Sequence, residues 1–249
     1  MSEALRVNRD GPVLTVTLNR PERRNAFDAA LIRDLADAFA DVGDARCVVL
    51  AGDGSSFCAG ADVDWQRSAI DLSFDENAED AMRLYRMLEA IDACPAPVVA
   101  RIQGYALGGG SGLVACADIA IASPDAVFGF SEVRLGIIPA VISPFVFARI
   151  GTAAARRYFL TGERFGADAA QRIGLVHEIS DDLDGAVGAV QRALLAGGPD
   201  AIRAAKRLAR ERPVGSELGE IAAARRASPE GQEGLRAFLA KRPPSWLEP

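Results

Sequence analysis

Two short stretches of small residues each follow a predicted strand and could bring backbone N–H groups close to a ligand. Residues 59–61 read Ala-Gly-Ala, and residues 108–110 are three glycines that begin a predicted helix. Each glycine in a helix costs about 1 kcal/mol relative to alanine, and that cost is understandable where a helix N-terminus with free N–H groups must approach a ligand closely. Donors at two such turns can together stabilise an oxyanion. A tight turn between strand and helix is an equally good interpretation of the first stretch on its own.

The triple glycine does not fit the loops that bind nucleotide phosphates. A Walker A loop requires Gly-Lys followed by Ser or Thr, and that sequence is missing here. Residues 108–112, Gly-Gly-Gly-Ser-Gly, also differ in spacing from Gly-x-Gly-x-x-Gly, and no acidic partner follows on the next predicted strand. Neither nucleotide motif is supported.

The single histidine restricts the chemistry further. His177 lies in a short strand-like run, where an isolated histidine is usually packed for structural reasons. A Ser–His–Asp triad would need this residue. The four cysteines are scattered without Cys-x-x-Cys spacing, and with a single histidine in the chain a zinc site is not expected. We therefore predict no metal site and a structural role for His177.

Charge and hydropathy exclude further classes of protein. The 249-residue chain has a formal net charge of −6 and no concentrated basic block, so a nucleic-acid partner is not expected. No apolar run approaches the ~20 residues of a membrane span, and the first residues lack the apolar core of a signal peptide. Together with unpaired cysteines, these features predict a cytoplasmic protein with no membrane partner.

The apolar periodicity predicts alternating strands and helices, followed by a helical C-terminus. Strands are expected at residues 13–18, 47–51, 97–102, 119–122 and 126–130. Helices are expected at residues 29–41 with Asp28 as N-cap, 76–93, 153–161, 167–173, 183–196, 201–210, 217–227 and 230–240, besides a short one after the triple glycine. This order predicts an α/β core over residues 1–195, with crossovers and a sheet covered on both faces, and a helical subdomain over residues 196–249.

Five motifs spread over nearly the whole chain form one recognisable pattern. They are Leu-Asn-Arg-Pro-Glu-Arg-Arg-Asn-Ala-Phe at residues 18–27, Phe-Cys-Ala-Gly-Ala-Asp at 57–62, Gln-Gly-Tyr-Ala-Leu-Gly-Gly-Gly at 103–110, Cys-Ala-Asp at 116–118 and Phe-Gly-Phe-Ser-Glu-Val-Arg-Leu-Gly-Ile-Ile-Pro at 128–139. Together they resemble the crotonase family, the enoyl-CoA hydratases and isomerases. The resemblance implies an α/β fold, a crotonase (ClpP-like) spiral of ββα units whose helical C-terminal subdomain forms homotrimers that often pair into hexamers. It also implies an acyl-CoA thioester substrate, with coenzyme A as part of that substrate and no permanently bound cofactor.

The resemblance assigns roles to residues within and near these motifs. It implies that the N–H groups of Ala61 and Gly109 hold the thioester oxygen and stabilise the enolate. Further residues are implied to contact CoA, the last two of them in a neighbouring subunit: Arg24, Ala59, Asp62, Val63, Phe238 and Lys241. For Lys241, a solvated charge at a helix end is the alternative.

The resemblance also points to the acid–base residue, which must reach the carbons beside the thioester carbonyl. Hydratases of the family usually carry two glutamates; Glu132 occupies one of the two positions, and Gly112 occupies the other. Glu132 then either passes a proton from water to the same face of the double bond or moves a proton between carbons, as in the family's Δ3,Δ2-isomerases. Compensation by Asp62 or Asp118 is a third alternative, and a non-catalytic acyl-CoA-binding protein is a fourth.

Three segments resemble a particular branch of the family, the one that contains bacterial methylglutaconyl-CoA hydratases. They are residues 131–144, 156–165 and 230–239, and glycine is common in that branch at the position of Gly112. The leading expectation is therefore addition of water to a short or branched 2-enoyl-CoA, with methylglutaconyl-CoA as one candidate. Arg134 could pair with a distal carboxylate of the substrate, but we favour a role in orienting Glu132 or anchoring its loop.

Overall fold

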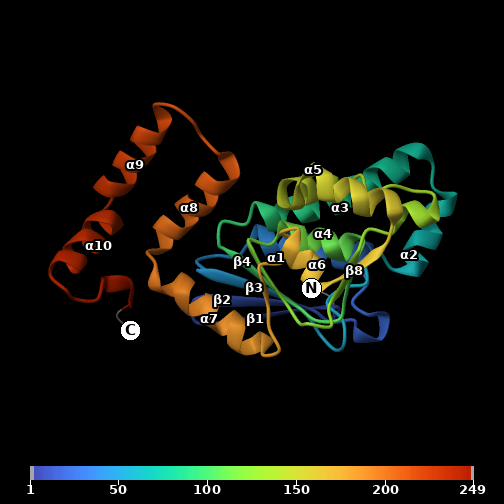
Figure 1. Ribbon diagram of the computed structural model, residues 1–249, viewed down its shortest axis with the longest axis horizontal. Coiled ribbons are helices and arrows are strands. Elements are labelled where there is room, and N and C mark those ends of the chain that lie inside the picture. The colour runs from blue at the N-terminus through green and yellow to red at the C-terminus, as the bar shows by residue number, and fades with distance from the viewer. Residues whose placement is uncertain (1–2, 248–249) are drawn as a thin grey trace.

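The strands divide between two sheets in a computed structural model that describes residues 3–247 (Figure 1). The main sheet has six strands, in the order β1 (Leu5–Asp10), β2 (Val13–Leu18), β3 (Cys47–Gly52), β4 (Val98–Ile102), β6 (Ile119–Ala122) and β9 (Glu178–Ile179). β1 and β2 form an antiparallel hairpin, and the remaining neighbours are parallel. The smaller sheet contains β5 (Tyr105–Leu107), β7 (Val127–Gly129) and β8 (Arg164–Gly166). Parallel strands joined by crossover helices confirm the predicted α/β class.

β9 falls within the strand-like run around His177 that the sequence indicated, but three other strands, β1, β5 and β8, were not expected from it. β1 buries only Leu5 fully and carries charged residues at three of its six positions, so it lacks a clear apolar alternation. β5 and β8 have three residues each, which is too short for a period-2 pattern to be recognised. Each of them forms through pairing with a neighbouring strand rather than through its own pattern.

Ten α-helices connect and cover the strands in the described part of the chain. They are α1 (Ala29–Ala40), α2 (Val63–Ser68), α3 (Phe74–Asp92), α4 (Gly109–Cys116), α5 (Ser143–Thr161), α6 (Ala167–Arg172), α7 (Leu183–Ala196), α8 (Pro199–Glu211), α9 (Glu217–Ala227) and α10 (Pro229–Leu239). Asp28 caps α1 as predicted, accepting hydrogen bonds from Ala30 and Leu31. The predicted start of α3 was two residues late, because Ser73 and Glu76 form a capping box. The predicted start of α5 was ten residues late, because the helix continues across a break at Gly151.

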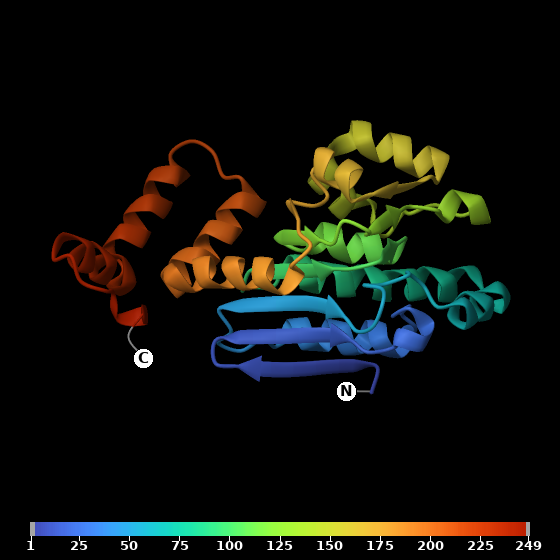
Figure 2. The same cartoon turned by 60° about the horizontal axis from the view of Figure 1, so that its bottom comes forward.

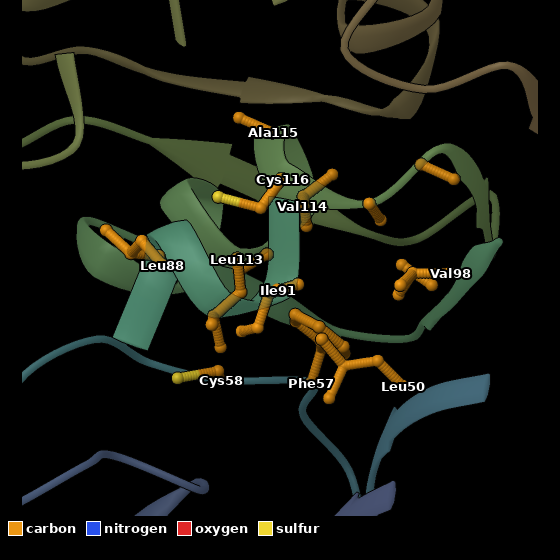
Figure 3. Packing of buried hydrophobic residues seen from close by; sticks show 14 of the residues in the cluster. Leu50, Phe57, Cys58, Leu88, Ile91, Val98, Leu113, Val114, Ala115 and Cys116 are labelled. Carbon is orange, nitrogen blue, oxygen red and sulfur yellow. The ribbon is translucent and has the colours of Figure 1, made fainter. Parts of the chain in front are cut away.

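The core lies on both sides of the main sheet. On one side, α1, α3 and α4 pack against the strands, and Figure 3 shows Leu88 and Ile91 of α3 converging with Leu113 of α4 and with Phe57 and Cys58. On the other side, Leu183 and Val187 of α7 cover residues of β3, β4 and β6. Every residue of β3 is buried, which confirms that this strand is covered on both faces.

Helices α8–α10 extend away from the sheets as an arm (Figures 1 and 2). The predicted boundary between residues 195 and 196 falls at the last residue of α7, just before this arm. Apolar side chains on the arm are open to solvent, among them Val214 (80% exposed) and Phe238 (79%). Such surfaces are typical of subunit interfaces, and the trimer stays a prediction. Within residues 3–247, no helix is both long enough and apolar enough to cross a membrane.

Candidate active site

The two turns of small residues lie side by side because the segment between them is hydrogen-bonded on both of its edges. On one edge, the N–H of Phe27 donates to the carbonyl of Gly60 (2.9 Å) and the N–H of Asp62 donates to the carbonyl of Phe27 (3.0 Å). On the other edge, Cys58 and β5 exchange two bonds, from Cys58 to Tyr105 (2.9 Å) and from Leu107 to Cys58 (3.0 Å). This pairing fixes the turn after β3 against the turn that begins α4.

Both predicted oxyanion donors have free N–H groups. Within residues 3–247, neither Ala61 nor Gly109 donates its N–H to an acceptor. Gly109 is the first residue of α4, where the N–H has no partner inside the helix and the helix dipole is positive. A Cβ on Gly60 would lie 3.7 Å from the nitrogen of Gly109, so the two turns are in contact. Ala61 and Gly109 both line one cavity of about 430 Å³.

The glycines at this junction are required by the protein's own packing. A Cβ on Gly109 would collide with the ring of Phe27, and a Cβ on Gly110 would collide with the carbonyl of Cys58. Gly108 has a φ of +53°, a conformation that favours glycine. The sequence suggested that these glycines let a ligand approach; their first function is to let the two turns approach each other.

Glu132 is the acid–base candidate that the structure places in this cavity. It begins the 3-10 helix η3 (Glu132–Leu135), and one carboxylate oxygen, Oε1, lies 3.2 Å from the position of a Cβ on Gly108. The other oxygen, Oε2, is buried and has no hydrogen-bond partner among the described residues. Burial raises the pKa of Glu132, and a backbone hydrogen bond only partly opposes this. A half-buried carboxyl group with an elevated pKa and a free oxygen is suited to accept and return a proton.

The position of the missing second glutamate is filled by Ile142. A Cβ on Gly112 would lie 2.7 Å from Cγ2 of Ile142 and 3.7 Å from a methyl group of Leu88. Ile142 lines the same cavity. An apolar side chain therefore occupies the space into which a carboxylate at residue 112 would project.

The two acids considered as replacements have structural roles instead. Asp62 caps α2 by accepting the N–H of Asp64, and it pairs with Arg20 at 3.1 Å. Burial raises the pKa of Asp62, but the Asp64 hydrogen bond and the nearby arginines lower it below its ordinary value. Asp118 accepts the N–H of Val98 and pairs with Lys206 at 2.7 Å. Neither aspartate lines the cavity, so compensation by them is ruled out for this arrangement.

The predicted CoA contacts fall in different places. Ala59 lines the main cavity, and Val63, at the start of α2, is 64% exposed. Arg24 lines a second cavity of about 270 Å³, where its guanidinium lies 5.5 Å from the ring centre of Tyr105. The N–H of Asp62 donates to the carbonyl of Phe27, and its carboxylate is bonded to Arg20 and Asp64. Asp62 therefore has no free N–H to offer to CoA, and its contact with CoA stays a prediction.

Phe238 and Lys241 lie on and just after α10, in the arm, and they line neither of the two cavities described above. Figure 1 shows α10 at the opposite end of the molecule from α2. Within one chain they cannot join the site, so a contact with CoA would have to be made in a neighbouring subunit, as the resemblance implied.

Arg134, His177 and Cys58 lie near the site or were considered for it. Arg134 does not line the cavity; its side chain lies 3.2 Å from the Cβ position of Gly162 at the end of α5, which supports the anchoring role. His177 accepts the N–H of Ala120 at 3.0 Å and is structural, as predicted. Cys58 is buried beside the donor turns, and burial raises the pKa of its thiol to about 12, which leaves it protonated and unsuited to act as a nucleophile.

Sequence reasoning missed two ionisable residues of the cavity wall, Arg164 of β8 and Asp80 of α3. Asp80 lines the cavity together with Asn77, Ala81 and Leu84. Their spacing of i, i+3, i+4 and i+7 is the signature of one helix face, and it could have grouped them. It could not have said which face of this largely polar helix meets the site.

Comparison with known proteins agrees with this geometry. The family model described as enoyl-CoA hydratase/isomerase matches residues 8–249. The chain belongs to this family, the crotonases. Among crotonases, a Thermus thermophilus protein provisionally named an enoyl-CoA hydratase is 34% identical over 247 residues, which cover 94% of this chain and 97% of that protein.

Solved protein structures share the whole fold. An enoyl-CoA hydratase from Shewanella pealeana superposes with a TM-score of 0.92 at 39% identity, covering 98% of this chain and 96% of the other. AtuE of Pseudomonas aeruginosa superposes with a TM-score of 0.94 at 37% identity, covering 99% and 100%. The predicted crotonase fold is confirmed over nearly the full length.

Proposed function

We propose that this crotonase is an enoyl-CoA hydratase that adds water to a short or branched 2-enoyl-CoA. One observation carries the proposal: the unpartnered carboxylate of Glu132 lines the same cavity as the free N–H groups of Ala61 and Gly109. Two donors suit the oxygen of a thioester whose carbonyl accumulates negative charge. A single carboxyl group suits proton transfer at the carbons beside it.

In this mechanism the water oxygen forms a bond to C3 while Glu132 takes a proton from that water. The electron pair of the double bond moves toward the thioester, and Ala61 and Gly109 donate hydrogen bonds to the enolate oxygen. Glu132 then returns the proton to C2, which restores its carboxylate and gives the 3-hydroxyacyl-CoA. The raised pKa of Glu132 favours this cycle, because the group must hold the proton between the two steps.

The test is loss of the conjugated enoyl-thioester absorbance when purified protein meets a panel of short and branched 2-enoyl-CoAs, with methylglutaconyl-CoA among them. Glu132→Gln should lower kcat by at least ~10²-fold. Glu178→Gln is the matched control, because that glutamate is exposed on β9, outside the cavity. Absence of turnover with every member of the panel contradicts the proposal.

A second candidate, Δ3,Δ2-enoyl-CoA isomerisation, is favoured by Ile142. Because this side chain fills the space beside Gly112, no second carboxylate from α4 helps to hold a water. Glu132 would then take a proton from C2 of a 3-enoyl-CoA and return it to C4. Formation of the conjugated 2-enoyl product from a 3-enoyl-CoA distinguishes this reaction from hydration.

The remaining expectations belong to the same proposal. We infer that CoA lies against Arg24, Ala59 and Val63, and that Phe238 and Lys241 complete its site from a neighbouring subunit of a trimer or hexamer in the cytoplasm. Exposed apolar residues on the arm support the assembly, and the mass of the protein in solution tests it. A non-catalytic acyl-CoA-binding protein would bind CoA esters without any effect of Glu132→Gln.

A further inference from the structure

One face of α3 lines the active-site cavity and changes in character along its length. Leu84 and Ala81 give it an apolar surface, and Asp80 and Asn77 continue the same face toward the N-terminal end of the helix. Leu88, the next residue of the face, is fully buried in the core. An acyl chain that leaves the thioester along this wall therefore passes from apolar to polar surroundings.

Asp80 is the ionisable group at the polar end. Its side chain is 17% exposed, and within residues 3–247 its ion-pair partner is Arg83, at 3.8 Å. Arg83 is itself 57% exposed and lies 3.9 Å from Glu79 as well. A carboxylate shielded from water normally has close donors, whereas these distances are long. Asp80 therefore retains the capacity to accept a hydrogen bond from a ligand.

Asn77, by contrast, is occupied. Its amide nitrogen donates to the carbonyls of Leu72 and Ser73, at 3.0 Å and 3.1 Å. These bonds hold the turn between the 3-10 helix η2 (Ala69–Asp71) and α3. Asn77 thus supports the wall, and Asp80 is the residue of the pair that can respond to the ligand's charge.

Asp80 does not replace the glutamate missing at residue 112. The Gly112 position touches Leu88, at 3.7 Å, and Asp80 precedes Leu88 by eight residues. Eight residues are two helical turns, about 12 Å along the axis. The carboxylate of Asp80 is thus displaced along α3 from the place of the second catalytic acid, and an acyl chain that runs along this wall would meet it beyond the double bond.

We propose that Asp80 is a specificity-determining residue, an inference that rests on the proposed function. Asp80 favours the binding of acyl groups that carry a hydroxyl or amine donor beyond the double bond. It disfavours the binding of acyl groups that end in a carboxylate. A donor satisfies the free oxygens of Asp80, and a second anion in this partly dry cavity is repelled. Methylglutaconyl-CoA, with its carboxylate, is then a poor substrate.

The cation in the cavity wall does not offset this effect. Arg164 lies on β8, a different element of the wall, with its Cγ 3.4 Å from the Cβ position of Gly129. Its guanidinium is 5.6 Å from the ring centre of Tyr105, which belongs to the second cavity with Arg24. The charge of Arg164 is thus held against β5 and β7, and Asp80 determines the charge at the α3 wall.

The test compares three saturated acyl-CoA esters of one chain length that end in a methyl, a hydroxyl or a carboxylate group. Calorimetric dissociation constants of the full-length protein should favour the hydroxyl ester over the carboxylate ester by ~10-fold or more. Asp80→Asn should remove most of this preference, and Asp80→Ala serves as a second variant. Glu79→Gln is the matched control: it lies next to Asp80 on α3, does not line the cavity and should leave the preference unchanged.

An equal or reversed preference in the unaltered protein overturns the proposal, and so does a preference that Asp80→Asn and Asp80→Ala leave intact. Because the saturated esters cannot be hydrated, the result is independent of catalysis. If the ester preference depends on Asp80 while no enoyl-CoA is turned over, the specificity assignment stands and the hydration proposal fails. The ratio of kcat/KM for the corresponding 2-enoyl-CoAs should follow the same order where turnover occurs.

Discussion

The Cγ2 methyl of Ile142 lies 2.7 Å from the point that a Cβ on Gly112 would occupy. Ile142 precedes α5 and is only 3% exposed, and Leu88 of α3 closes the other side of the same space. Glycine at residue 112 is therefore part of a packed arrangement that involves three segments of the chain. This packing explains why Glu132 has no second glutamate beside it. One substitution at residue 112 is therefore not enough to restore a second catalytic acid.

Gly112→Glu should accordingly destabilise the protein and fail to create a second working acid. Overpacking of a filled core costs about 1–3 kcal/mol, and a buried unpaired carboxylate adds to that cost. Urea unfolding should give a lower free energy of unfolding for this variant than for the unaltered protein. Full stability of Gly112→Glu would mean that Ile142 does not restrict this space.

Combining Gly112→Glu with Ile142→Ala should recover part of the loss, because the smaller side chain vacates the space. Ile142→Ala alone is the necessary control, with an expected cost of about 2–5 kcal/mol from the cavity it leaves. The double variant should be more stable than the sum of the two single effects predicts, by about 1 kcal/mol or more. Strict additivity would show that the two residues do not compete for one space.

Gly109→Ala should impair catalysis through the backbone. The added methyl group meets the ring of Phe27, so the start of α4 must shift and carry the Gly109 N–H away from the position of the oxyanion. Loss of one oxyanion donor typically costs about 10²–10³ in kcat. Gly166→Ala is the control, because an added Cβ there meets no atom within 4 Å. Equal kcat values for the two variants would remove Gly109 from the donor pair.

The pH dependence of stability should show that ionised Glu132 lowers the free energy of unfolding. Because burial raises its pKa above 4.5, the folded protein binds the proton more tightly than the unfolded chain does. Glu132 therefore lowers the stability of the fold least at a pH below the pKa that it has in the unfolded chain. The free energy of unfolding decreases as the pH rises through the pKa that Glu132 has in the folded protein. Glu132→Gln should have a higher Tm than the unaltered protein at about pH 8, and the difference should shrink at about pH 4. A lower Tm for this variant at both pH values would contradict the assignment of an uncompensated buried carboxylate.

The donor turns could be predicted from sequence because their signal is local. Glycine and alanine at residues 59–61 and 108–110 report backbone conformations and close contacts, and those depend on a few neighbours. What the sequence could not supply was the partner in each contact. Phe27 lies more than eighty residues from Gly109 along the chain, yet the ring of Phe27 occupies the space that a side chain at residue 109 would need.

The composition of the cavity wall was harder to predict for the same reason. α3 carries acids on several of its faces, including Asp75, Glu76, Glu79 and Asp80, so its own pattern does not show which one points inward. Ile142 offered no signal either, because a single apolar residue before a helix is ordinary in any chain. Both roles arise from tertiary packing, which brings α3, α4 and the segment before α5 to one cavity.

Lys206 should be one of the residues that anchor the arm to the core. It is 9% exposed on α8, and its ammonium group pairs with Asp118 at 2.7 Å and donates to the carbonyl of Ala96 at 3.1 Å. Removing one partner of a buried pair leaves the other charge unpaired, which is strongly destabilising, and the 27% exposure of Asp118 moderates the loss.

We expect Lys206→Met to cost about 2–3 kcal/mol in urea unfolding, whereas Arg207→Met, at an exposed neighbour, should cost little. Adding Asp118→Asn to Lys206→Met should cost less than the two single effects combined, and an additive result would show that the pair does not couple α8 to the sheet.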